Sequence, residues 1–333
     1  MTTPPSSNSA SLATVFRGRN VLKFLLGLTV TALVVWALFR FVGGREALGK
    51  TLEQARWIWI WPGVLFLLFN LYLSAERWRS IVETMDFQLP LKPAFNAVMV
   101  TWPLSLFTPS RASDLLRAYL VRDRVPVWQG GGSVLAEKLI DVQSLCILAM
   151  LGSAIQGLWL WFLVALGLLV AEWFAVLFLV WGTGWVRRWP KLEALAEKIR
   201  RALESLYALA RKPHRLLLVC FLSMLAWVGS FVIILSLLAV VNVSLPLTQI
   251  MALWPLAIFV GQLPLTLAGM GTRDLAFYSL LVTLNAGQVD KAAILTATFL
   301  YALVVTWFPA ILGIPFVIRT LLQSRRESSR QEL

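Results

Sequence analysis

The sequence predicts an all-helical polytopic membrane protein, with six full spans and two re-entrant, broken-helix hairpins in an inverted repeat. Hydrophobic residues make up 59% of the 333 residues and charged residues only 14%, whereas soluble domains have about 45–50% and about 25%. Apolar segments of a length that crosses a bilayer recur along the whole chain. Two shorter apolar segments each lead into a break that contains proline and charged residues, and such backbone survives at membrane depth only where protein or a cavity surrounds it.

Each predicted span has at least about 17 residues, the lower limit for a transmembrane helix. The six spans are Val21–Val42, Trp57–Ser74, Ser133–Ile155, Trp159–Trp181, Leu216–Val241 and Lys291–Ile318. The shorter segments Pro93–Phe107 and Leu247–Leu263 are each expected to begin a re-entrant hairpin. Residues 21–318 would then form a single membrane domain.

Basic residues gather in segments 183–215 and 319–333. The first segment has leucines at helical spacing, so we expect a basic amphipathic helix on the anionic cytoplasmic leaflet. Cytoplasmic loops collect Lys and Arg, which places both segments inside, together with residues 1–20, expected to be a disordered arm. The net charge of +13 then reports the orientation of a bacterial inner-membrane protein, and no nucleic-acid partner is expected. In this topology the two hairpins enter from opposite sides, as in the inverted repeats of transporters.

Three sequence features could point to cofactors, and none has the context that cofactor binding requires. Gly44–Thr51 fits the phosphate-loop pattern G-x-x-x-x-G-K-T, but that motif needs a preceding strand, and here a predicted span precedes it. We therefore expect a short interfacial helix there and no nucleotide. His214 is the only histidine, and Cys146 and Cys220 both lie in apolar segments, so we expect neither a metal site nor a disulfide.

The two breaks hold the residues expected to bind a substrate. The first reads PSRASDLLR over Pro109–Arg117, and the second reads PLTLAGMGTRD over Pro264–Asp274. Charged residues inside a bilayer are costly and tend to be functional, and the planar arginine side chain suits phosphate oxygens. We expect the aspartates to pair with the arginines in the empty site. The predicted binding residues of the breaks are Pro109, Arg111, Asp114, Arg117, Pro264, Gly269, Gly271, Arg273 and Asp274.

Acidic residues within the predicted spans form a second group. Glu137 and Asp141 are four positions apart and so share one helix face. We expect them to pair with Arg117 or Lys138, or to carry protons, and we include both in the predicted site. Glu172 lies alone in the span Trp159–Trp181, and either a structural or a functional role is open for it.

Several motifs in order resemble the flippase-like membrane family named for the transmembrane region of lysylphosphatidylglycerol synthase. They are Arg77-Trp78-Arg79, Ser113-Asp114 with Arg117, Glu137-Lys138 with Asp141, and Gly269-Met270-Gly271-Thr272-Arg273-Asp274. The family pattern usually has Gly-Glu, Glu-Arg and Arg-Glu where this chain has Ser113-Asp114, Glu137-Lys138 and Arg273-Asp274. The resemblance covers residues 15–320 and implies the lipid-translocating part of such proteins, without the synthase activity of a soluble domain.

The sequence therefore favours translocation, by flipping or scrambling, of an anionic lipid, either a phospholipid or a polyprenyl-phosphate-linked sugar. The alternative is a non-transporting lipid-binding partner that presents substrate to a membrane enzyme such as a glycosyltransferase, with the 183–215 helix as its docking surface. We do not expect an enzyme, although Glu137 and Asp141 are compatible with acid–base chemistry. The expected partners are membrane lipids.

Overall fold

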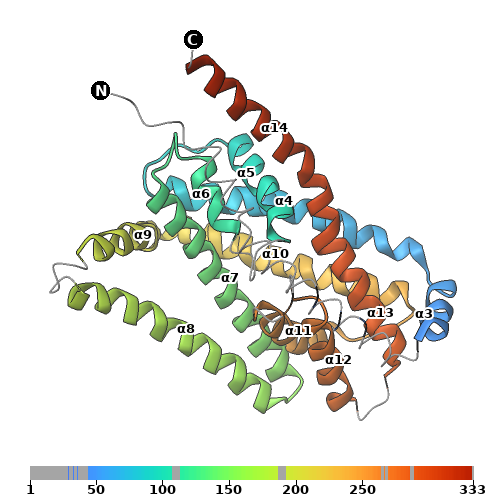
Figure 1. The fold of residues 1–333 in the computed structure, drawn as a ribbon. Helices are drawn as coiled ribbons and strands as arrows, with labels where there is room; N and C mark the ends of the chain where they lie inside the picture. The colour runs from blue at the N-terminus through green and yellow to red at the C-terminus, as the bar shows by residue number, and fades with distance from the viewer. Residues whose placement is uncertain are drawn as a thin grey trace.

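The computed structural model describes residues 29, 33, 36, 44–106, 113–186, 193–263, 266, 269–285 and 289–331. Within these residues the chain forms helices and connecting turns, with no strand (Figure 1). The all-helical prediction is confirmed for this part of the chain. The helices before the midpoint are α3 Gly44–Glu53, η1 Trp57–Trp59, α4 Ile60–Glu83, α5 Leu91–Ser105, α6 Leu116–Leu120 and α7 Val127–Ile155. They are followed by α8 Trp159–Val186, α9 Glu193–Arg211, α10 Pro213–Val240, α11 Leu247–Gln262, α12 Thr272–Leu284, α13 Lys291–Ala302, the π-helical segment η5 Leu303–Trp307 and α14 Phe308–Gln331.

Four helical stretches in the described residues are long and apolar enough to cross a membrane. They are Trp57–Glu83, Trp159–Gly182, Pro213–Val240 and Lys291–Gln323. These coincide with four of the six predicted spans. A fifth prediction, Ser133–Ile155, falls on α7, which is one continuous helix of 29 residues but is not among those four. The first predicted span, Val21–Val42, lies outside the described residues apart from three positions.

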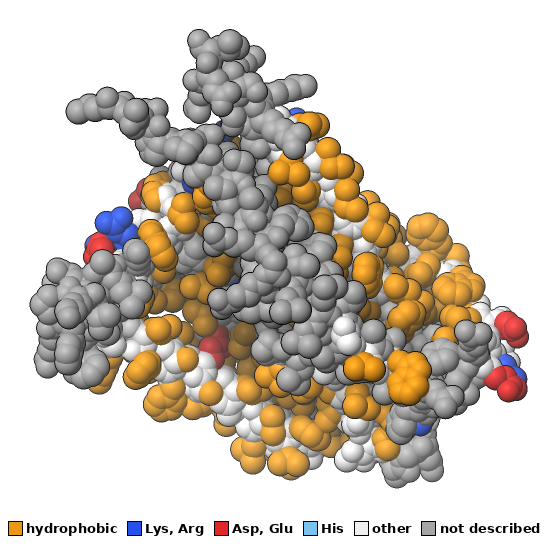
Figure 2. All heavy atoms as spheres, viewed as in Figure 1, with side chains coloured by type: hydrophobic (Ala, Val, Ile, Leu, Met, Phe, Trp, Pro, Cys, Tyr) orange, Lys and Arg blue, Asp and Glu red, His pale blue; other side chains and the backbone are white. Residues whose placement is uncertain are grey.

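Hydrophobic side chains cover most of the visible described surface, and charged ones lie mainly toward its two ends (Figure 2). Helix α8 shows this most clearly, with Phe178 77% and Trp181 79% exposed. Such a surface is stable only against lipid, since water would leave this apolar area unburied. The protein is therefore a membrane protein with several apolar helices.

The two predicted hairpins each contain a pair of helices around a break. Helices α5 and α6 pack together, and so do α11 and α12. The pairs lie toward opposite ends of the molecule, α5 and α6 at the upper left and α11 and α12 at the lower right of Figure 1. Residues 107–112, 264–265 and 267–268 fall outside the described residues, so the predicted site residues Pro109, Arg111 and Pro264 do too.

Helix α9 differs from the expected surface helix. Its apolar side chains Leu203 and Leu209 are 7% and 2% exposed, and Leu206 packs against a cluster that includes Ile81 of α4 and Val219 of α10. The amphipathic pattern therefore reflects a contact with the rest of the protein, and this face is not free to enter a leaflet. The segment Gly44–Thr51 lies within helix α3, as expected from its poor phosphate-loop context.

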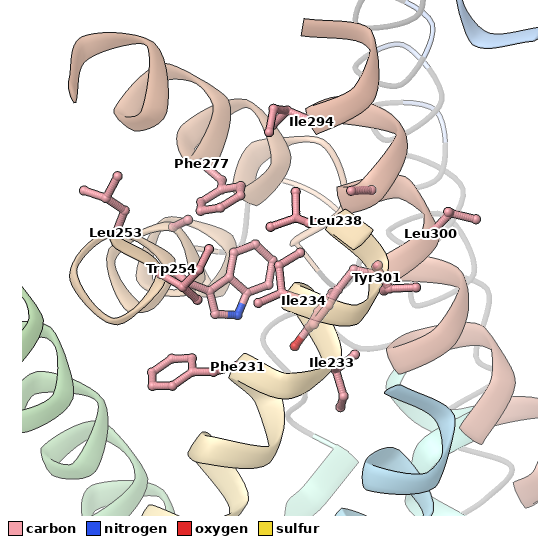
Figure 3. Close-up of a cluster of buried hydrophobic side chains, with 14 of the residues drawn as sticks. Phe231, Ile233, Ile234, Leu238, Leu253, Trp254, Phe277, Ile294, Leu300 and Tyr301 are labelled. Atoms are coloured by element: carbon pink, nitrogen blue, oxygen red, sulfur yellow. The ribbon is translucent and has the colours of Figure 1, made fainter. Parts of the chain in front are cut away.

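Aromatic packing joins the helices of the second half into one core. Trp254 of α11 stands edge-on to Phe277 of α12, with ring centroids 4.9 Å apart, and to Tyr301 of α13, at 4.7 Å. Phe231 and Ile234 of α10 lie on the same cluster, as Figure 3 shows. Such edge-to-face pairs add to the hydrophobic gain of burial. This core fixes α11 and α12 against α10 and α13.

We predict that Gly152→Ala destabilises the protein by about 1–3 kcal/mol, because a methyl group there overpacks a helix crossing. An added Cβ would lie 2.5 Å from the backbone nitrogen of Ala252 in α11. The control is Gly167→Ala on α8, where nothing lies within 4 Å and the higher helix propensity of alanine favours the folded state by up to about 1 kcal/mol. The midpoint of thermal unfolding in detergent should fall for the first variant only, and equal midpoints would contradict the close crossing.

Candidate functional site

Residues from both halves of the chain line a single cavity of about 290 Å³. Helices α4, α7 and α10 supply much of its wall, with α11 and α13 on the other side. The predicted residues Arg117 and Arg273, from the two separate breaks, both line it. Its charged lining residues are Arg77, Asp114, Arg117, Glu137, Lys138, Asp141 and Arg273. The structure thus brings residues of both breaks to one cavity with a mixed charged and apolar lining.

A buried carboxylate on α7 connects two arginines in this wall. Glu137 is 0% exposed. Its Oε1 atom accepts a hydrogen bond from Arg77 Nη2 at 2.6 Å, and its Oε2 atom accepts one from Arg117 Nη1 at 2.9 Å. One ionised side chain therefore balances charge from two elements, α4 and α6.

The same pairing continues outward from both arginines. Arg77 also donates from Nη1 to Asp141 Oδ1 at 2.6 Å, and Ser223 of α10 donates to the same oxygen at 2.6 Å. On the other side, Arg117 Nη2 lies 3.2 Å from Asp114 Oδ1. The series ends where Lys138 Nζ lies 2.6 Å from Asp114 Oδ2.

Positive and negative side chains alternate through this series, which we call the charge cluster. Its members in order are Asp141, Arg77, Glu137, Arg117, Asp114 and Lys138. Three acidic and three basic groups give a formal charge of zero. Buried charges are tolerated best when every one has a partner of opposite sign, and each member of the cluster has such a partner. One buried donor, Arg117 Nε, makes no hydrogen bond within the described residues.

Local helix geometry explains how the first half builds the cluster. Glu137 and Asp141 lie one turn apart on α7, so both point to the same side, toward α4. Asp114 and Arg117 are three positions apart at the start of the short helix α6, which suits a contact within one turn. Trp78 is 0% exposed and donates a hydrogen bond from Nε1 to Ser133 Oγ at 2.9 Å. The Arg117 guanidinium lies over the indole of Trp78, 5.9 Å from the centroid of the indole ring.

A glycine turn positions Arg273 in the second half. Gly269 and Gly271 have φ values of 72° and 87°, a region that side-chain-bearing residues rarely adopt. A Cβ at Gly269 would also collide with the backbone of Gly261 in α11. The turn leads directly into α12, whose first turn carries Arg273 and Asp274.

Asp274 ties this turn and its neighbouring arginine together. Its Oδ2 atom accepts the Gly271 backbone N–H at 3.0 Å, and Oδ1 accepts Arg273 Nε at 3.1 Å and Nη2 at 2.9 Å. The Arg273 guanidinium also lies 4.7 Å from the ring centroid of Tyr301 and 5.7 Å from that of Trp254. Cation–π attraction and the carboxylate together hold its cationic side chain, which is 7% exposed.

The predicted residues fall into three groups in the structure. Asp114, Arg117, Glu137, Asp141, Gly269 and Arg273 line the cavity, whereas Gly271 and Asp274 shape the Arg273 turn behind it. Pro109, Arg111 and Pro264 lie outside the described residues. The predicted pairing of Arg117 with Glu137 is confirmed, and so is the pairing of each aspartate with its arginine. A substrate-binding role for these residues stays a prediction.

Sequence reasoning missed Arg77 as a site residue. It placed Arg77 at the polar end of the span Trp57–Ser74, but α4 continues to Glu83 and Arg77 is 6% exposed. The apolar residues Trp78, Ile81 and Val82, which are fully buried, continue the helix beyond the predicted end. That apolar continuation was the signal in the sequence. The described residues contain no group of three or more His, Cys, Asp and Glu side chains placed to hold a metal ion.

These observations define a helical membrane protein whose helices enclose a cavity with several charged side chains in its lining. The family model for the lysylphosphatidylglycerol synthase TM region matches residues 24–313, and the chain belongs to this family. The match includes every residue of the charge cluster and the Arg273 turn. A comparison with curated proteins finds no match.

We predict that Arg77→Met destabilises the protein by about 3–5 kcal/mol, because it leaves buried carboxylates without their partner. Arg79→Met is the matched control. Arg79 lies two positions along the same helix and pairs with Glu76 and Glu83, but its side chain is 29% exposed, so its loss should cost less than about 1 kcal/mol. Thermal unfolding followed by size-exclusion chromatography compares the stability of the two variants. Equal losses of stability would show that Arg77 is no more important to the fold than an exposed arginine.

Proposed function

We propose that this protein moves an anionic lipid, by flipping or scrambling, between the leaflets of a bacterial inner membrane. The observation that carries the proposal is the meeting of Arg117 and Arg273, from two separate breaks, in one cavity. Arginine binds phosphate through paired N–H groups. Family membership supports a membrane role of this kind, and the lipid itself is either a phospholipid or a polyprenyl-phosphate-linked sugar.

The cavity size favours a head group as the part that enters. A volume of about 290 Å³ lies at the lower end of the ~300–1,000 Å³ of ligand sites. Lipid tails need no polar site, because the bilayer already solvates them. The lipid would therefore cross with its head group in the cavity and its tails in the surrounding hydrocarbon.

Charge exchange gives a mechanism for binding. The arginine of each break is paired with an aspartate of the same break, Arg117 with Asp114 and Arg273 with Asp274. An incoming phosphate that replaces a carboxylate leaves the arginine balanced throughout, so neither the free nor the loaded site exposes an unpaired buried cation. Lys138, whose side chain is 41% exposed, can follow the displaced Asp114.

The proposed topology has six full spans, two hairpins entering from opposite sides, and both termini in the cytoplasm. The placement of α5 and α6 opposite α11 and α12 supports it (Figure 1). In inverted repeats of this kind the substrate site lies between the halves near the membrane midplane. Rocking of one half against the other would open the cavity to each leaflet in turn.

The alternative role, presentation of a lipid to a separate membrane enzyme through α9, has weaker support. Arg200 and Arg201 are well exposed, but both hydrogen-bond to Glu197. These bonds hold the pKa of Glu197 at about 2, and its carboxylate offsets part of the positive charge of the two arginines. Co-purification of an enzyme that is lost on neutralising both arginines would favour this role.

We predict that Arg117→Gln and Arg273→Gln each slow translocation of fluorescent phosphatidylglycerol in proteoliposomes by about 10- to 100-fold, the value of a charged hydrogen bond. Arg124→Gln is the control, because Arg124 is 45% exposed and lies outside the cavity lining. Variants are compared only where size-exclusion profiles match wild type.

Two results would count against the proposal. One is a wild-type protein that binds anionic lipids but moves none of them. The other is unchanged transport by both folded cavity variants.

A further inference from the structure

Glu172 differs from every acidic residue of the charge cluster. It is the single ionisable residue in α8. Both of its carboxylate oxygens are buried, and neither has a hydrogen-bond partner among the described residues. In contrast, Glu137 and Asp141 accept hydrogen bonds from arginine at 2.6 Å.

The position of Glu172 in the membrane makes this unusual. It is near the middle of the 28-residue helix α8, roughly 20 Å from either end at about 1.5 Å per residue. Its neighbours Trp173 and Phe174 are 51% and 67% exposed on a surface that faces lipid. Water therefore has no ready access from either membrane surface.

Among the described residues, the helices packed against α8 offer no basic partner at this depth. Helix α11 contains no ionisable residue. On α7, Glu137 and Asp141 are held by Arg77, and Lys138 pairs with Asp114. The remaining ionisable group of α7 is Cys146, a buried thiol that carries no positive charge. Helix α9 meets the far end of α8, and Glu197, Glu204, Arg200 and Arg201 there pair among themselves.

An ionised carboxylate without a partner is very costly in such surroundings, whereas the neutral acid is tolerated. A proton on Glu137 or Asp141 would instead have to displace arginine hydrogen bonds. We propose that Glu172 is the proton-binding site of this membrane domain, in place of Glu137 and Asp141. It is a neutral carboxylic acid at pH 7 while α8 rests on α7, and it ionises only in a state in which water reaches its carboxylate.

The first test labels the purified, lipid-reconstituted protein with the apolar reagent dicyclohexylcarbodiimide at pH 7. The acid adds across one C=N bond. Its proton goes to nitrogen and its oxygen bonds to the central carbon, and the adduct rearranges to a stable N-acylurea with no leaving group. Peptide mass spectrometry should find Glu172 labelled at least about tenfold more than Glu137 or Asp141, since one pKa unit is tenfold in the neutral form. Preferential labelling of Glu137 or Asp141 would overturn the proposal.

Infrared spectroscopy covers the case in which the reagent cannot reach the site. The carbonyl band of a neutral carboxylic acid should be present in wild type at pH 7 and reduced in Glu172→Gln, a neutral variant of the same shape. Identical bands in the two proteins would also overturn the proposal. Neither measurement requires transport.

A transport consequence follows, and this part rests on the proposed function. A pH gradient across the vesicle should change the translocation rate of the wild type by severalfold, and Glu172→Gln should abolish that response. If wild type moves no lipid, the proposed function fails while the labelling result stands. If wild type and variant respond equally to the gradient, Glu172 is not the coupling site.

Discussion

The structure of the site depends on Glu137, a fully buried carboxylate shared by two arginines. Arg77 comes from α4 and Arg117 from α6. Both pair with Glu137, and each also pairs with one aspartate, Arg77 with Asp141 and Arg117 with Asp114. Removal of a single member leaves an uncompensated buried charge. The six residues of the charge cluster therefore act as one unit that fixes three helices relative to one another.

The second half holds its arginine in another way. Arg273 is bound by one carboxylate and two aromatic rings, on a turn with glycine at two positions whose φ values other residues rarely adopt. The first half thus holds its arginines in a chain of ion pairs, and the second half holds one arginine against a single carboxylate and two aromatic rings. Under the proposed function, the phosphate of a head group would replace Asp114 on Arg117 while it contacts Arg273 on the other side. Such a site keeps its charges paired when empty and would still accept an anion.

The sequence was sufficient to predict the all-helical membrane class, because twenty-residue apolar segments are a local property. It also predicted the importance of both breaks, since charge, proline and glycine are conspicuous in apolar surroundings. The sequence did not predict the role of Arg77. An arginine at the end of an apolar segment is typical of an anchor at the membrane interface, and only the structure shows its partners on α7. The amphipathic pattern of α9 was read as a membrane-surface helix for a similar reason. Its leucines have the same spacing whether they meet lipid or, as here, Ile81 and Val219.

The most direct test of the account is a cryo-electron microscopy structure of the protein in nanodiscs of phosphatidylglycerol. We expect a lipid phosphate in the cavity, within hydrogen-bond reach of Arg117 and Arg273, with Asp114 turned away from Arg117. A cavity without a head group, with every ion pair of the charge cluster unchanged in an anionic bilayer, would contradict it.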